Sequence, residues 1–409
     1  MRSNFFKHVI AIGALLIAAT SLTSAQSGAT RPRRTLPNST PPPVTTNNPP
    51  ARQTSPAPSS ANTPANPAAT SAGSGDTMHA FTLLQQKQYA AALKEAKQIA
   101  AADPKNSEAW KIAGFAGLSM QQFAEAASNL QRALDLQRAA GQEDPNTANA
   151  LAQAYVRSEA FDRALPLLTA ATTKPGTPPD PVMLYYKGLA EFRTGKKEVA
   201  EQSFNAAVKA DPKNAAALFY LGQIAYDSNR LDAAIANLNR ATLSDARLSN
   251  AWSLLTTAYL RRAATAGADP KADADYTNAV RAGETLFRLR PEAQAATLYG
   301  QALIGAKQYA RAATVLERVA AAEDAPGTTL YLLGIAHSRV KTFPKAIAAL
   351  ERAAAKTPDN VNIFRELGYA YEVSKQYAKA LSAYQKGASL EPDAADFKES
   401  IERVQPFAK

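Results

Sequence analysis

The stretch that decides the fold is residues 218–226, LFYLGQIAY, together with residues 233–238, AAIANL, which follow after a short break. A small residue, Gly222, stands in the first segment, and another, Ala234, stands in the second. Small side chains at these positions allow two consecutive helices to approach closely, because the distance between packed helices depends on the side chains at their contact. We therefore interpret the stretch as one helical hairpin.

The hairpin pattern recurs along most of the chain. The small residue of the second helix is Ala in every aligned copy: Ala92, Ala126, Ala164, Ala200, Ala234, Ala279, Ala312, Ala346 and Ala380. A unit of this length cannot bury its apolar face alone, so its neighbours must cover it in a stacked solenoid. The sequence predicts an all-α fold, a right-handed superhelical solenoid of about nine hairpins with a C-terminal capping helix. The units are expected to start near residues 73, 107, 145, 181, 215, 249, 293, 327 and 361.

The ends of the chain differ from this body. We expect the solenoid over residues 77–392, and a capping helix and tail over 393–409. Residues 26–76 are rich in Pro, Ser, Thr and Asn, which predicts a disordered linker. A spacer role is the simpler interpretation of this linker, and contact with the cell wall or envelope is the alternative.

Residues 1–25 have the pattern of a secretory signal peptide. Arg2 and Lys7 precede the apolar run 9–19, and small residues lead up to Ala25. The apolar run is shorter than the roughly 20 residues that a membrane span needs, which favours cleavage near Ala25 over a retained anchor. The protein is therefore expected to be exported, and to be periplasmic or secreted.

Several positions of the repeat resemble the tetratricopeptide repeat (TPR) family over roughly residues 73–392. The matching residues are Trp110 and Trp252, the Leu-Gly steps at 221–222, 333–334 and 367–368, and Tyr155, Tyr259 and Tyr371. The resemblance implies that the first helix of each hairpin lines a concave groove that binds peptides of other proteins. The Lys/Asn clamp that family members use for an acidic C-terminal peptide is not matched.

The groove positions of this chain are rich in Tyr, Phe and Arg. Such residues are enriched at the centres of protein interfaces, and here they favour an extended or helical peptide with acidic groups. Packing between helices is the alternative role for the aromatic side chains. Asn149 and Gln153 are expected to add polar contacts. The candidate groove residues are Tyr185, Tyr186, Phe192, Arg193, Phe219, Tyr220, Tyr226, Tyr331, Arg339, Arg365 and Tyr369.

The sequence offers little for catalysis. It contains no cysteine and three histidines, and it lacks the HExxH, GxSxG and GxGxxG motifs. Ser338 and Lys341 have SxxK spacing, but the companion motifs of that site are absent, so we interpret the match as chance. We expect no catalytic residue, no metal site and no cofactor, and we predict that the protein is not an enzyme.

These observations predict a non-catalytic scaffold or adaptor of the cell envelope that binds a partner protein. The alternative is a repeat protein that binds glycan or cell wall, with its aromatic rings stacked on sugars. The formal net charge of +11 includes the arginines of the linker, so it is no signature of a nucleic-acid partner, and none is expected.

Overall fold

The computed structural model describes residues 77–174, 176, 178–267 and 269–408. The predicted signal segment 1–25 and the predicted linker 26–76 lie outside these residues. Within the described ranges every regular element is a helix. None of these described helices combines the length and the apolar character that crossing a membrane requires.

The helices form consecutive hairpins. The first helices are α2 (Thr77–Gln85), α4 (Ser107–Ser119), α6 (Pro145–Arg157), α8 (Pro181–Arg193), α10 (Ala215–Asp227), α12 (Ser249–Ala266), α14 (Ala293–Gly305), α16 (Gly327–Arg339) and α18 (Val361–Val373). The second helices are α3 (Tyr89–Ala102), α5 (Phe123–Ala139), α7 (Phe161–Thr172), α9 (Lys197–Ala210), α11 (Leu231–Ser244), α13 (Pro270–Leu289), α15 (Tyr309–Ala320), α17 (Phe343–Lys356) and α19 (Tyr377–Leu390). The chain closes with α20 (Ala395–Val404) and a 3₁₀ turn, η1 (Gln405–Phe407).

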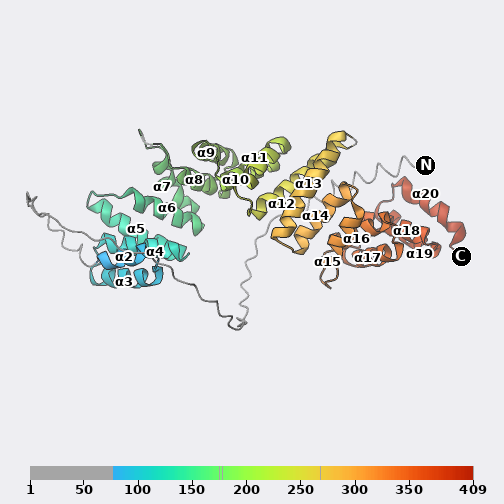
Figure 1. Ribbon diagram of the computed structural model, residues 1–409, viewed down its shortest axis with the longest axis horizontal. Coiled ribbons are helices and arrows are strands. Elements are labelled where there is room, and N and C mark those ends of the chain that lie inside the picture. The colour runs from blue at the N-terminus through green and yellow to red at the C-terminus, as the bar shows by residue number, and fades with distance from the viewer. Residues whose placement is uncertain (1–76, 175, 177, 268, 409) are drawn as a thin grey trace, which may run out of the picture.

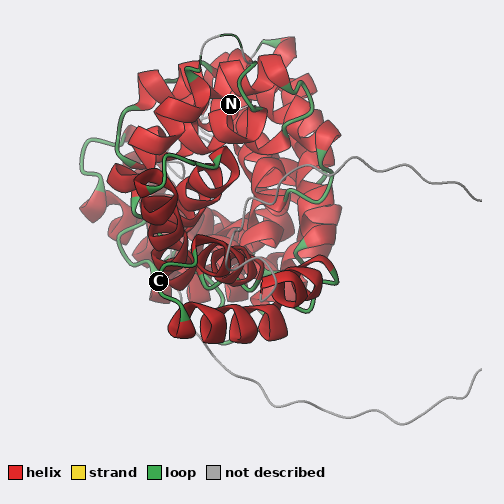
Figure 2. Ribbon diagram, turned by 90° about the vertical axis from the view of Figure 1, so that its left-hand side faces the viewer, coloured by secondary structure: helices red, strands yellow, loops and turns green. Residues whose placement is uncertain are grey.

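The hairpins stack in chain order. Figure 1 shows them following one another from α2 at one end of the molecule to α20 at the other. In the end-on view of Figure 2 the helices curve around a common centre, as they do in a superhelix. Each helix packs mainly against its neighbours in the sequence. The expected fold class, an all-α repeat solenoid, is confirmed.

A glycine in the first helix allows the two helices of a hairpin to meet. A Cβ atom added at Gly222 would lie 2.6 Å from Cγ of Leu238, closer than real Cβ contacts. The side chain that fills this space is therefore the buried Leu238 of α11. Ala234, which the sequence pairs with Gly222, is also buried and offers its backbone carbonyl to the same contact.

A residue in the left-handed conformation reverses the chain in each hairpin. In the eighth hairpin this residue is Lys341, with a φ of 64°. Its N–H donates to the carbonyl of Ser338 at 3.1 Å, and the N–H of Thr342 donates to the carbonyl of His337 at 2.9 Å. This is the Schellman pattern, which satisfies the last carbonyls of a helix and turns the chain sharply.

The buried core is divided along the solenoid. One cluster of buried apolar residues lies between Ala80 and Ala116, a second between Ala126 and Ala190, and a third between Leu184 and Val404. Such a division is expected where each repeat contacts only its neighbours.

The sixth hairpin is longer than the others. The sequence of this unit has an insertion, residues 261–275, for which a position between the two helices was the expectation; instead it mostly lengthens them, because α12 runs to Ala266 and α13 begins at Pro270. The guanidinium of Arg262 joins the two helices through Asp275 at 2.6 Å and reaches Asp232 of α11 at 2.5 Å.

Candidate functional site

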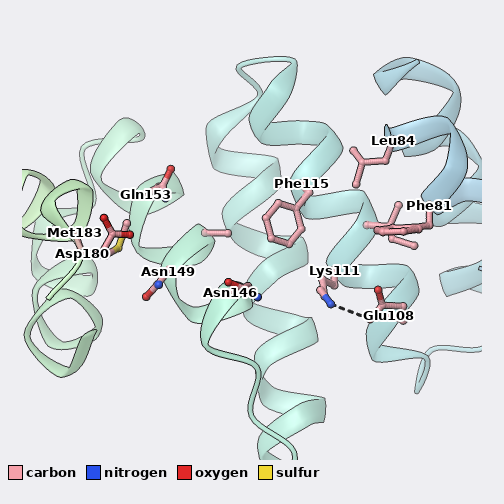
Figure 3. A pocket seen from close by; sticks show the side chains of 12 residues that line it. Phe81, Leu84, Glu108, Lys111, Phe115, Asn146, Asn149, Gln153, Asp180 and Met183 are labelled. Atoms are coloured by element: carbon pink, nitrogen blue, oxygen red, sulfur yellow. Dashed lines mark hydrogen bonds and ion pairs between the residues drawn. The ribbon is translucent and has the colours of Figure 1, made fainter. Parts of the chain in front are cut away.

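The first helices of hairpins one to four enclose a hollow of about 440 Å³ (Figure 3). Side chains from α2, α4, α6 and α8 line it. Its apolar lining is made by Phe81, Leu84, Ile112, Phe115 and Met183. Its polar lining is made by Glu108, Lys111, Asn146, Asn149, Gln153 and Asp180.

Two amide side chains of α6 lie along the wall of the hollow. Asn149 and Gln153 are four residues apart, so they share one face of the helix. Both are half-buried, and neither side-chain amide has a hydrogen-bond partner within the described part of the chain. Each amide offers two donors and one acceptor. The wall therefore carries hydrogen-bonding groups that no neighbouring side chain uses.

An aromatic residue stands between α2 and α6. Phe115 of α4 lies beside Phe81 and Leu84 of α2 on one side and Asn149 on the other (Figure 3). Phe115 occurs four residues after Lys111, so the two project from the same face of α4. This places an apolar surface directly beside the unused amides.

The charges of the hollow are fixed by one ion-pair network. Nζ of Lys111 lies 3.2 Å from Oε2 of Glu108 and 3.1 Å from Oδ2 of Asp144. Burial acts to lower the pKa of Lys111, but the bonds and charges of Asp144 and Glu108 outweigh it and raise this pKa above its usual value. With Asp180 at the opposite wall, carboxylates outnumber ammonium groups around the hollow.

Asp144 also holds the start of α6 in place. Its carboxylate accepts a hydrogen bond from the backbone N–H of Asn146 at 2.9 Å and so caps the helix. Burial acts to raise the pKa of Asp144, but this N–H and Lys111 lower it below the usual value. The cap therefore stays ionised at neutral pH and orients the helix that carries Asn149 and Gln153.

The predicted aromatic residues of hairpins four and five come together in a second region. The rings of Tyr185 and Tyr220 have centroids 6.3 Å apart, and Tyr220 stacks on Phe204 at 5.2 Å with an interplanar angle of 4°. Phe192 and Phe219 each lie 5.3 Å from Tyr220. Burial is the main cause that raises the pKa of Tyr185 above its usual value. These rings largely pack against one another between α8, α9 and α10.

Three further predicted residues border this aromatic region. Tyr186 lies 5.4 Å from Tyr185, ring to ring. Tyr226 is half-buried beneath the guanidinium of Arg261, which lies 5.0 Å from its ring centroid. Arg193 is exposed at the end of α8.

The prediction that Tyr331 faces a groove is wrong. Its side chain is 1% exposed, and it belongs to the core that also contains Leu330 and Leu333. The reason is that α16 packs directly against α14 as well as against its sequence neighbours. First helices this close cover the face that would otherwise line a groove.

The predicted groove arginines of hairpins eight and nine are bound to carboxylates. Arg339 of α16 donates to both carboxylate oxygens of Glu366 in α18, at 2.8 and 3.1 Å. Arg365 of α18 donates to Asp396 in the first turn of α20 at 2.5 Å. These pairs join helices and account for both arginines without a ligand. Tyr369 is half-buried, with its ring 6.3 Å from that of Phe343.

The hollow contains Asn149 and Gln153, which the sequence analysis expected to make polar contacts, and also Lys111, which it did not single out. Lys111 and Asn149 occupy the same position in their hairpins as Tyr185 does in hairpin four, the fifth residue of the first helix. The repeat alignment was therefore the signal that could have found Lys111, because Lys111 aligns with the predicted residues Asn149 and Tyr185. No cluster of three or more potential metal ligands occurs among the described residues.

Four stretches of the chain match a family model described as tetratricopeptide repeat, at residues 116–181, 149–215, 185–247 and 331–395. The chain is a tetratricopeptide repeat protein. Two of the stretches, 116–181 and 149–215, contain the residues of α6 and α8 that line the hollow, which are half of its lining; the other half belongs to α2 and α4, before the first matched residue. A search of curated proteins finds no match.

Solved structures similar to this TPR protein include YrrB, described as a TPR protein with an unusual peptide-binding site. The identity is 16%, the alignment covers 49% of this chain and 99% of that one, and the TM-score is 0.42. PilW, described as a type IV pilus biogenesis factor, has 16% identity, coverage of 53% and 92%, and a TM-score of 0.42. MamA from Desulfovibrio magneticus RS-1 has 23% identity, coverage of 44% and 97%, and a TM-score of 0.38. The likeness is one of architecture.

Proposed function

We propose that this TPR protein is a non-catalytic scaffold that binds a peptide segment of a partner protein in the hollow of hairpins one to four. The observation that carries the proposal is the pair of unused amides, Asn149 and Gln153, beside the exposed face of Phe115. TPR proteins in general act as scaffolds for protein–protein interaction.

The chemistry of the hollow fits an extended peptide. An amide side chain can donate to a backbone carbonyl and accept from a backbone N–H, so two amides one turn apart can hold one strand of peptide. An apolar peptide side chain would then lie against Phe115 and Phe81, where burial of apolar surface contributes about 25 cal/mol per Å².

The charge of the hollow favours a peptide with a basic residue. Glu108 and Asp180 border it, and the one lysine, Lys111, is already paired. Complementary charge mainly sets specificity and association rate. The hollow is therefore expected to prefer peptides that contain a Lys or an Arg. This differs from the acidic peptide expected from the arginines of later hairpins, which are engaged with carboxylates.

The aromatic region of hairpins four and five supports the glycan alternative less well. Sugar rings stack on open aromatic faces. The rings of Tyr185, Tyr220 and Phe204 instead pack against one another. We therefore retain peptide binding as the proposal.

The test begins with a library of displayed peptides, selected on the full chain. Affinities of the enriched peptides are then compared with those for Asn149→Ala/Gln153→Ala and for a matched control, Gln202→Ala/Asn205→Ala, which removes two exposed amides from α9. We expect the first variant to bind roughly tenfold or more weakly, since each lost hydrogen bond contributes about 1 kcal/mol. Equal affinity of the two variants, or no enrichment of peptides, would contradict the proposal.

We also propose that the scaffold acts in the cell envelope, outside the cytoplasm. The support is the basic and apolar pattern of residues 1–25. Cell fractionation of a C-terminally tagged chain tests this, and retention in the cytoplasmic fraction would contradict it.

A further inference from the structure

The hairpin turns of units seven, eight and nine share a pattern that the proposed peptide site does not use. Each turn reads Lys, any residue, an aromatic residue, any residue, and a second basic residue, in the order 307–311 KQYAR, 341–345 KTFPK and 375–379 KQYAK. The equivalent turns of units two to five all contain an acidic residue: 121–125 QQFAE, 159–163 EAFDR, 195–199 GKKEV and 229–233 NRLDA. The turn of unit one, 87–91 KQYAA, has the lysine and the aromatic residue but no second basic residue, so the complete pattern occurs in three consecutive units at the C-terminal end.

The first lysine of each turn is held in the left-handed conformation. The φ angles of Lys307, Lys341 and Lys375 are 59°, 64° and 60°. Glycine suits this conformation best, and hairpin four has Gly195 at the same place with a φ of 81°. Other units have Lys87, Gln121, Glu159 or Asn229 at this place, so the turn accepts several residue types and its geometry does not account for three consecutive lysines.

Much of this positive charge is open to solvent. Lys341 and Lys375 are exposed and have no carboxylate within ion-pair distance among the described residues. The ammonium of Lys379 lies over the ring of Tyr371, 5.4 Å from its centroid. Lys345 is paired with the exposed carboxylate of Glu317 at 3.0 Å. The three turns therefore present more cations than anions.

Apolar side chains are exposed among these cations. Val340 is 36% exposed, Val373 43% and Phe407 63%. Val340 borders a shallow hollow of about 390 Å³ together with the turn 307–311 of the preceding unit. The ring of Phe407 lies 5.2 Å from that of Tyr377, which places it at the turn of unit nine. Consecutive hairpins stack in the same direction, so the turns and these side chains form one edge of the solenoid.

We propose that this basic edge, made of the turns 307–311, 341–345 and 375–379 with Val340, Val373 and Phe407, docks on a bilayer that contains anionic phospholipid. Lysines near an anionic leaflet are attracted to it, and apolar side chains between them can enter the interfacial region. A nucleic acid fits less well, because the aromatic residues of the motif, Tyr309, Phe343 and Tyr377, are half-buried in helix packing and do not offer free stacking faces. Docking by units seven to nine leaves the hollow of units one to four open to a peptide.

The test uses the full chain and sedimentation with vesicles of phosphatidylcholine alone or mixed with phosphatidylglycerol. The edge variant is Lys341→Gln/Lys345→Gln/Lys375→Gln/Lys379→Gln. Gln is chosen because hairpin two already has Gln121 in the left-handed conformation at its turn. The matched control, Lys105→Gln/Lys209→Gln/Lys213→Gln/Lys356→Gln, removes the same charge from exposed lysines near the opposite ends of the helices.

We expect the wild type to prefer anionic over neutral vesicles by roughly tenfold or more, and the edge variant to lose this preference while the control retains it. The preference should also weaken in 0.5 M salt, where charges are screened over a few ångströms. A second variant, Val340→Ser/Val373→Ser, should weaken binding to anionic vesicles with every lysine present.

Three outcomes would overturn the proposal. The first is equal binding of the wild type to neutral and anionic vesicles. The second is equal loss of the preference in the edge variant and in the control. The third is binding of inorganic polyphosphate or an acidic peptide through the edge lysines without binding of anionic vesicles. Circular dichroism of each variant verifies that the helices are intact.

Discussion

Tyr331 shows that the position of a residue in the repeat does not by itself determine whether its side chain is exposed. It occupies the fifth position of its first helix, as Tyr185 does, yet it is fully buried whereas Tyr185 is half-buried. The difference arises from how closely α16 lies to α14, which no residue within the hairpin specifies. Alignment can therefore place a side chain on a helix face, but the packing between units decides whether that face is open.

The hydroxyl group of Tyr331 is buried and has no hydrogen-bond partner among the described residues. Burial raises the pKa of this hydroxyl above its usual value, so it stays protonated and neutral. An unpaired buried polar group costs about 1–3 kcal/mol. We expect Tyr331→Phe to leave the free energy of unfolding unchanged or to raise it by about 1 kcal/mol, as measured by urea denaturation at 25 °C.

Tyr384→Phe is the matched control for this prediction. The hydroxyl of Tyr384 donates to Glu372 at 2.7 Å, so its loss should lower the free energy of unfolding by about 1 kcal/mol. If both substitutions destabilise the protein equally, the hydroxyl of Tyr331 has a partner in solution.

At the scale of the element, the C-terminal helix α20 is attached by charged groups as well as by its apolar face. Phe397 and Val404 are buried, and Arg403 donates to Glu372 of α18 at 2.7 Å. The amphipathic pattern of 397, 401 and 404 predicts a helix that covers the last hairpin. The ion pair was not predictable, because its partner lies in a different helix 31 residues away.

The attachment of α20 should weaken in acid. Burial acts to raise the pKa of Glu372, but the bonds from Arg403 and Tyr384 lower it below the usual value. A group whose pKa is lower in the folded state stabilises the fold above its unfolded pKa, about 4.3 for Glu, and this contribution is lost as the pH falls through the folded pKa. We expect the melting temperature of the wild type to fall more between about pH 5 and pH 3 than that of Glu372→Gln.

Thermal unfolding of both proteins across this pH range provides the measurement. Glu399→Gln serves as the control, since it removes an exposed carboxylate of α20 and should retain the acid sensitivity of the wild type. Parallel curves for the wild type and Glu372→Gln would show that Glu372 has no part in the acid response.

At the scale of the whole molecule, the fold was more predictable than the site. The repetition of Ala and Gly along the chain is enough to predict stacked hairpins, because each unit must be covered by the next. The hollow depends instead on the spaces between α2, α4, α6 and α8, and on which side chains are left without partners there. Those features follow from superhelix geometry rather than from any motif.

The division of the core predicts that damage stays local. Leu134 and Leu350 are both buried, but they belong to different clusters. Each Leu→Ala substitution should cost about 2–5 kcal/mol where it occurs. We expect Leu134→Ala to speed amide hydrogen exchange in α4 to α7 and Leu350→Ala to speed it in α16 to α19, each without effect on the other segment, as measured by mass spectrometry. A uniform increase along the chain would mean that the solenoid unfolds as one unit.

The long sixth hairpin has a consequence for how this gene could change over time. Its extra residues lengthen α12 and α13 in the direction of the hairpin tip, where Figure 1 shows the pair extending past its neighbours. α12 still packs against α11 of the fifth unit and α13 against α14 of the seventh, and Arg262 joins the two lengthened helices through Asp275. Hairpin tips are therefore the positions at which such a gene can acquire or lose coding sequence while the rest of the protein is inherited unaltered.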